Sequence, residues 1–102
     1  QLGKVGQSIE GHEQAGKRPC VIIKPLNRLE LAVVVPVTTR KPRGIPSIVR
    51  LTKGAGELDK ESYVLCHQIR TISYKRIVHT IGMLTNHEFN KIRWSLSNLF
   101  GL

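Results

Sequence analysis

Three polar residues, Glu13, Arg18 and Thr38, are of the types that can cleave an RNA phosphodiester without a metal ion. RNA carries its own nucleophile, the 2′-hydroxyl. A catalyst then needs a base beside that hydroxyl, cationic donors on the phosphoryl oxygens and an acid for the departing 5′-oxygen. Glu13 can serve as the base, and the planar guanidinium of Arg18 suits a phosphoryl group. Thr38, at the end of an apolar run, can add a neutral donor.

The same residue types also occur in ordinary structural settings. A glutamate in a glycine-flanked loop is usually solvated, an arginine before a proline is compatible with a simple ion pair, and Thr38 is compatible with a strand cap. His67 lies within an apolar run and is more typical of a buried core histidine than of a catalyst. Residue type alone therefore leaves both interpretations open.

The charge of the chain is strongly basic, with 16 Lys and Arg against 7 Asp and Glu and a formal net charge of +9. Such an excess favours a polyanionic partner, because neutralising phosphates releases condensed counterions. Between Gln14 and Gly56 the one acidic residue is Glu30. Nucleic acid is the favoured partner, with an acidic protein or a plain solvated surface as the alternatives. The cations of this stretch are Lys17, Arg18, Lys24, Arg28, Arg40, Lys41, Arg43, Arg50 and Lys53.

The sequence lacks the motifs of metal, nucleotide and serine-hydrolase chemistry. His12 and Glu13 are not followed by a second histidine at the HExxH spacing, and no P-loop, GxGxxG or GxSxG occurs. We therefore predict no metal and no other cofactor. Cys20 and Cys66 lie in apolar runs and are expected to be reduced and buried, as in a cytoplasmic protein. No apolar run reaches transmembrane length and no signal-peptide pattern opens the chain, so we expect no membrane association.

The periodicity predicts a single, mainly β domain over residues 1–102. Residues 1–18 show no sustained period and are expected to form a long loop. Pro36 is expected at a bulge, or at an edge where no ladder donor is needed. Strands are predicted for 20–24, 31–37, 47–52 and 63–72, an exposed connection for 40–47, a turn for 54–56 and a helical turn for 73–77.

The clearest element is a C-terminal helix of about 13 residues, a typical length for a globular domain. Thr85 and Glu88 form a capping box, and Leu84 and Phe89 have the spacing of a hydrophobic staple. Gly101 is expected to end the helix. Together the elements predict a small, partly open β-barrel with this helix packed on it. The apolar face of the helix consists of Phe89, Ile92, Leu96 and Leu99.

Three blocks of the sequence, taken together, resemble one family. Residues 11–19, GHEQAGKRP, resemble the G-[SH]-E-Q-x-G-x-R-P signature of the MazF/PemK family of toxin endoribonucleases. The run VVPVTT at 34–39 is similar to the family's strand that ends in a threonine. LDKESYVLCHQIRTI at 58–72 is similar to its DKDSVVLCDQIRTID block, and LFGL at 99–102 to its ending.

This resemblance implies an SH3-like barrel of the CcdB/PemK type that acts as a homodimer. It implies a toxin of a type II toxin–antitoxin system that cleaves single-stranded RNA at short motifs without a metal, and so inhibits translation and growth. The implied products carry 2′,3′-cyclic phosphate and 5′-hydroxyl ends. The implied partner is an antitoxin whose acidic, flexible tail covers the RNA groove.

Carried over residue by residue, the resemblance places Arg18 at the family's catalytic arginine and Thr38 at its catalytic threonine. Glu13 matches the loop glutamate, which is a less uniform participant. The remaining candidates are Arg40, Lys41 and Arg43 for the RNA backbone, and His12, Gln14, Lys17, Thr39, His67, Gln68 and Arg70 for catalysis or RNA binding.

Two departures from the family pattern bear on the site. His67 stands where some members have an aspartate implicated in catalysis, so proton transfer falls to His67 or to Glu13. Residues 1–10 do not resemble the family's leading strand, G-[DE]-[IV]-[WY], so this strand is expected to be truncated or replaced, with an exposed edge that a partner covers. The alternative function is non-catalytic on the same barrel: a CcdB-like toxin, or a protein that only binds RNA or an antitoxin.

Overall fold

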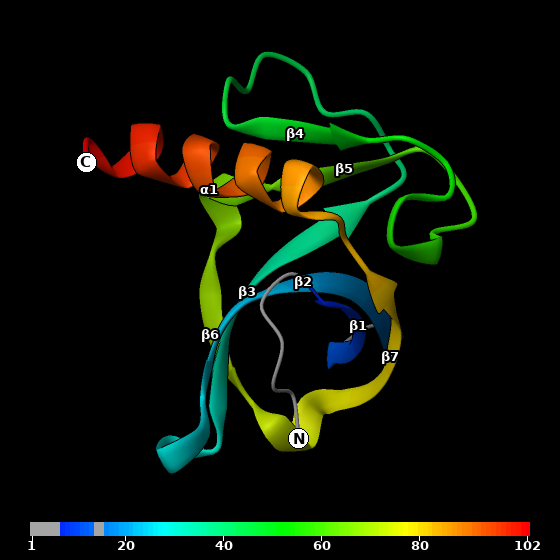
Figure 1. Cartoon of the computed structure of the whole chain (residues 1–102). Coiled ribbons are helices and arrows are strands. Elements are labelled where there is room, and N and C mark those ends of the chain that lie inside the picture. The colour runs from blue at the N-terminus through cyan, green and yellow to red at the C-terminus, as the bar shows by residue number, and fades with distance from the viewer. Residues whose placement is uncertain (1–6, 14–15) are drawn as a thin grey trace.

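The computed structural model describes residues 7–13 and 16–102 (Figure 1). Within these ranges strands are the main regular structure and one α-helix closes the chain, with short 3-10 turns between strands. The strands are β1 (Gln7–Glu13), β2 (Gly16–Leu26), β3 (Leu31–Thr38), β4 (Ile48–Leu51), β5 (Ser62–Leu65), β6 (Arg70–Ser73) and β7 (Ile77–Met83); the helix is α1 (Asn86–Phe100), and the 3-10 turns are η1 (Asn27–Leu29), η2 (Ala55–Glu57), η3 (Cys66–Gln68) and η4 (Tyr74–Arg76).

The strands form one antiparallel sheet in the order β4-β5-β3-β2-β1-β7, and β6 pairs with β3 beside β5. Among the described strands no ladder joins β4 to β7, so the sheet stays open as it curves (Figure 1). The helix packs against β4 and η3. The predicted fold, a mainly β, partly open barrel with a C-terminal helix, is confirmed.

Pro36 lies where β3 changes its second neighbour. Residues 31–34 of β3 pair with β6, and residues 37–38 pair with β5, so neither of these ladders includes the proline. This agrees with the expected position that needs no ladder donor. The register shift of the β2–β3 ladder lies elsewhere, between Ile22 and Lys24.

The core has two clusters, one on each face of β3, because successive side chains of a strand point to opposite faces. The larger cluster lies under α1, and the smaller lies against β6 and η4. Cys20 and Cys66 are free and buried, as expected. The larger cluster contains Val21, Val35, Val37, Val49, Leu51, Ala55, Leu58, Val64, Cys66, Leu84, Phe89, Ile92 and Leu96; the smaller contains Cys20, Ile22, Ala32, Val34 and Ile72.

The expectation of a long loop over residues 1–18 is wrong for residues 7–13 and 16–18, which belong to β1 and β2. β1 pairs with β2 on one side and with β7 on the other, so residues 7–13, the last three of which belong to the block at 11–19, form a strand that has no open edge. Its polar sequence shows no apolar alternation. Backbone ladders on both sides hold it instead, and such ladders leave no sequence signature.

The run 63–72, predicted as one strand, is two strands separated by η3. Both strands pair with β3, so the turn lets one apolar run cover two stretches of the same partner. His67 lies in this turn and is exposed, and the expectation of a buried core histidine is therefore wrong. The helical turn expected near 73–77 is η4, whereas β7 was not predicted.

The helix begins as predicted. The Thr85 side chain accepts a hydrogen bond from the N–H of Glu88, and the Glu88 side chain accepts one from the N–H of Thr85. Leu84 and Phe89 are both buried, and Gly101 ends the helix with a φ of 73°. Leu99, expected in the core, is 43% exposed, because the last turns of α1 project beyond the strands that cover its start (Figure 1).

Within the part of the chain that the structure describes, no helix combines the length and the apolar character needed to cross a membrane.

Candidate nucleic-acid interface

Thr38 begins a row of side chains that crosses three strands of the sheet. It lies directly opposite Tyr63 of β5, and Tyr63 lies opposite Arg50 of β4. Directly opposed residues of antiparallel strands place their side chains on the same face. Their neighbours along the strands point into the larger core cluster, so the row faces away from that cluster. Thr38 and Tyr63 are partly buried and Arg50 is exposed; we call these three residues the polar row.

Arg18 lies on β2, the strand next to β3 in the sheet. Cys20 of β2 pairs with Pro36 of β3 in an antiparallel ladder. This pair ends the ladder, and Arg18 on β2 and Thr38 on β3 each lie two residues beyond it, still within their strands. The two residues that the sequence nominated for the phosphoryl oxygens therefore lie on adjacent strands, just beyond the same end of the ladder that joins them.

Arg70 lies on the same face of the sheet as the polar row. It pairs with Val34, which is four residues before Thr38 on β3 and hence on the same face. Its side chain is exposed. The sheet thus gathers a third predicted residue, from β6, on the face that carries Thr38.

Thr38 also acts as a strand cap, the structural role that is compatible with its sequence position. Its hydroxyl oxygen accepts a hydrogen bond, 3.2 Å long, from the backbone N–H of Arg40, which caps the end of β3. The hydroxyl hydrogen stays available as a donor. The segment that follows is basic and exposed: Thr39, Arg40, Lys41 and Arg43 all lie on the surface.

His67 lies at the far end of that basic segment. Its Nδ1 is 3.4 Å from the Oγ of Ser47, and the Nε2 of Gln68 is 3.5 Å from the Nε2 of His67. Ser47 is buried, and its carbonyl accepts a hydrogen bond from the N–H of Cys66. The pair therefore ties η3 to the residue before β4, where the basic segment ends.

Four candidates lie in or beside the β1–β2 hairpin. The backbone ladder pairs His12 with Lys17 and Glu13 with Gly16. Gln14 lies outside the described residues, and the structure gives only backbone positions for the other three. The assignment of Glu13 as a base stays a prediction.

Sequence reasoning did not single out Tyr63 and Arg50. The alternation in 47–52 already placed Arg50 on the face opposite Val49 and Leu51. The missing information was the adjacency of β4, β5 and β3, because the order of strands in a sheet is not written in the pattern of any one strand.

Two other features bear on chemistry: the metal-ligating side chains and the buried Cys66. In residues 7–13 and 16–102 no three His, Cys, Asp or Glu side chains gather as a metal site would require. Burial raises the pKa of the Cys66 thiol, and a hydrogen bond with Ser95 lowers it by less. A buried thiol that resists ionisation is a poor nucleophile, so Cys66 is part of the core.

Comparison with solved structures gives close likeness over the whole chain. An endoribonuclease in complex with its cognate antitoxin from a mycobacterial species is 26% identical, with a TM-score of 0.81 over 96% of this chain and 94% of that one. The Mycobacterium tuberculosis toxin MazF-mt6 is 25% identical, with a TM-score of 0.77 over 94% and 98%. MazE-MazF from Deinococcus radiodurans is 22% identical, with a TM-score of 0.83 over 100% and 98%, which shows a shared fold.

A family model agrees with the structural likeness. The model of the PemK-like, MazF-like toxins of type II toxin–antitoxin systems matches residues 4–100. The match includes the strands that carry positions 18, 38, 50, 63 and 70. The chain therefore belongs to the family of PemK-like, MazF-like toxins of type II toxin–antitoxin systems.

Proposed function

We propose that the chain is a toxin endoribonuclease that cleaves single-stranded RNA on the face of the sheet that carries the polar row. Membership of the toxin family and the likeness to a mycobacterial endoribonuclease support the enzyme class. The observation that carries the proposal is the placement of position 18 and Thr38 on adjacent strands, each two residues beyond the Cys20–Pro36 pair. A catalyst of this reaction needs a guanidinium and a hydroxyl donor together on one phosphoryl group.

In the proposed reaction the 2′-oxygen attacks the adjacent phosphorus while the bond from phosphorus to the 5′-oxygen breaks. Arg18 and Thr38 stabilise the charge that develops on the phosphoryl oxygens. Glu13 or His67 takes the proton of the 2′-hydroxyl, and an acid returns a proton to the departing 5′-oxygen. The products are a 2′,3′-cyclic phosphate and a 5′-hydroxyl. No metal takes part in these steps.

The basic surface supports RNA as the substrate. Arg40, Lys41 and Arg43 follow directly on Thr38 and are exposed. Single strands pass along cationic surfaces of this kind, and binding weakens as salt is added, because phosphate contacts release counterions. We assign these three residues to the RNA backbone on either side of the cleaved bond, together with Gln68 and Arg70 on the neighbouring turn and strand.

The proposal is tested by incubating the purified protein with a long single-stranded RNA in the presence of EDTA. We expect discrete fragments with 2′,3′-cyclic ends, whose positions primer extension then maps. Arg18→Ala should abolish cleavage while the circular dichroism spectrum stays that of the wild type. RNA binding without fragments would instead support a non-catalytic protein, and loss of cleavage in EDTA would contradict the metal-free mechanism.

Two protein partners are also proposed: a second copy of the chain, and an antitoxin with an acidic, flexible tail. The mycobacterial neighbour was solved with its cognate antitoxin, and the charge of +9 favours an acidic partner.

A groove of about 460 Å³ between the start of β4 and α1 offers apolar surface, with Trp94 and Leu99 exposed in its lining. Light scattering measures the oligomeric state. Trp94 is the one tryptophan in the sequence, so a change in its fluorescence emission reports whether a partner covers this groove.

A further inference from the structure

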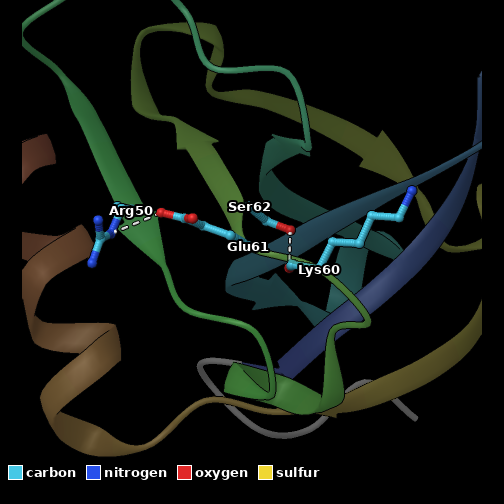
Figure 2. A network of polar contacts seen from close by, with 4 residues as sticks. All are labelled: Arg50, Lys60, Glu61 and Ser62. Atoms are coloured by element: carbon cyan, nitrogen blue, oxygen red, sulfur yellow. Dashed lines mark hydrogen bonds and ion pairs between the residues drawn. The ribbon is translucent and has the colours of Figure 1, made fainter.

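Arg50, at the outer end of the polar row, is paired with a carboxylate of its own chain. Its Nε lies 3.1 Å from the Oε2 of Glu61, and the two side chains are 64% and 45% exposed. Figure 2 shows the side chains pointing toward one another, Arg50 from β4 and Glu61 from the residue just before β5. The guanidinium therefore already holds an anionic oxygen ligand at the surface.

The backbone fixes Glu61 in that position. The buried Ser62 donates a hydrogen bond of 2.9 Å from its hydroxyl to the carbonyl oxygen of Lys60, which holds the two residues on either side of Glu61 (Figure 2). The side chain of Lys60 points away from Arg50 in the same view. Glu61 is thus the anion that faces Arg50, and the hydrogen bond between its two neighbours holds its backbone in place.

The distance from Arg50 to Thr38 suits a neighbouring phosphate. Adjacent strands lie about 4.8 Å apart, so the two residues are separated by about 10 Å across β5. Arg50 has a long side chain on the same face as Thr38. A strand of RNA whose cleaved phosphate lies at Thr38, and which continues across β5, presents a further phosphate near the guanidinium.

The Arg50–Glu61 pair is easily exchanged. Exposed ion pairs contribute little to stability, because water screens both partners and each side chain loses freedom. A guanidinium binds phosphate with the same two-pronged geometry that it offers a carboxylate. An RNA phosphate held in place by the rest of the interface can therefore displace the glutamate.

We propose that Arg50 binds a phosphate next to the cleaved one, and that the Glu61 carboxylate occupies Arg50 until RNA displaces it. This inference rests on the proposed function. It makes Arg50 an RNA-binding residue that acts on KM, and Glu61 an internal competitor that weakens RNA binding.

The test uses steady-state cleavage of a short RNA that contains one mapped site, measured over a series of NaCl concentrations. Arg50→Ala should raise KM by roughly fivefold with little change in kcat, since one charge-assisted contact is lost. The slope of log(kcat/KM) against log[NaCl] should become shallower by about one. Glu61→Gln should lower KM by about two- to threefold, and this gain should vanish in Arg50→Ala/Glu61→Gln.

Arg28→Ala is the matched control. Arg28 is an exposed arginine of η1, beside the opposite end of β3 from Thr38. Arg28→Ala removes the same charge as Arg50→Ala but leaves the polar row unchanged. The KM of this variant should therefore stay near that of the wild type. An RNA with a 2′-deoxy nucleotide at the cleaved position lacks the attacking hydroxyl and is not cut. Measuring its binding to each variant by fluorescence anisotropy repeats the comparison without turnover.

The outcomes separate the inference from the proposed function. If the wild type cleaves and Arg50→Ala matches it in KM and salt slope, the inference is wrong and the nuclease stands. Equal losses in Arg50→Ala and Arg28→Ala would also overturn it, since only net charge would then matter. A higher KM in Glu61→Gln would overturn the role of the glutamate. A wild type that cuts no RNA overturns the proposed function itself.

Discussion

A Cβ atom placed on Gly82 would lie 2.4 Å from the carbonyl oxygen of Gly56. Strand β7 and turn η2 therefore touch backbone to backbone. η2 belongs to the connection between β4 and β5 at one end of the sheet, and β7 is the last strand at the other end. The two ends of the open sheet thus meet through this contact, where the described strands have no ladder to join them.

Replacing Gly82 should separate the two ends of the sheet. In Gly82→Ala the new methyl group overlaps a backbone carbonyl, which cannot move as a flexible side chain would. We expect the free energy of unfolding to fall by about 1–3 kcal/mol, as for other overpacked sites. Urea denaturation measures this loss. Gly44→Asn is the control, because that site is open and asparagine tolerates its positive φ of 66°; an equal loss there would contradict the explanation.

Thr38→Val should remove activity and leave the fold intact. Valine keeps the β-branched shape that suits a strand but lacks the hydroxyl. We expect cleavage to slow by about 100-fold, the effect of losing one donor to a developing oxyanion. The same change at Thr71, which is exposed on β6 and pairs with Val33 rather than with the polar row, should leave the rate unchanged. Near wild-type cleavage by Thr38→Val would remove the threonine from the mechanism.

The Cys66 thiol should make stability fall at high pH. Burial raises its pKa in the folded chain above the ordinary value of 9.0. Below that value the thiol is protonated in both states and its full contribution is present. As the pH rises through it, the unfolded chain loses the proton first and is stabilised, so the free energy of unfolding declines. Denaturation from about pH 8 to pH 10, compared with Cys66→Ala, isolates this slope; identical slopes would exclude it.

The capping box should account for part of the stability of α1. Thr85→Ala removes the acceptor for the N–H of Glu88 and should cost about 1 kcal/mol. Asn86→Ala, at the next position, removes no side-chain hydrogen bond of the capping box and serves as the control. Thermal unfolding followed at the helix band of the circular dichroism spectrum measures both. A loss of the same size in the control would assign the effect to helix propensity.

The parts of this fold that local chemistry specifies were predictable. The capping box, the staple and Gly101 define α1 because each is a short-range pattern with one physical solution. The alternation in 47–52 likewise gave β4. Leu99 lay on the predicted apolar face and is nevertheless exposed, since periodicity records which way a side chain points and not where its covering strand ends.

The parts that depend on distant pairing were not predictable. β1 has a polar sequence and exists through ladders to β2 and β7. β7 was missed, and the run 63–72 was read as one strand because nothing local marks η3 as a turn. The candidate site shows the same difference between what the sequence indicates and what only the pairing of distant strands reveals. Arg18 and Thr38 were found through a family resemblance, whereas Tyr63 and Arg50 became visible only with the order of strands.

The polar row is assembled from three strands, with Thr38 on β3, Tyr63 on β5 and Arg50 on β4, and Arg18 lies on a fourth, β2. No contiguous stretch of the chain contains the row, and a slip of one residue in any ladder would turn that strand's member toward the opposite face. On the proposed function, an unfinished or misfolded copy of the toxin therefore cannot cut RNA. On this proposal the cell that makes the toxin is exposed to its activity only once the whole sheet has formed, which leaves the time of synthesis and folding for a partner to bind.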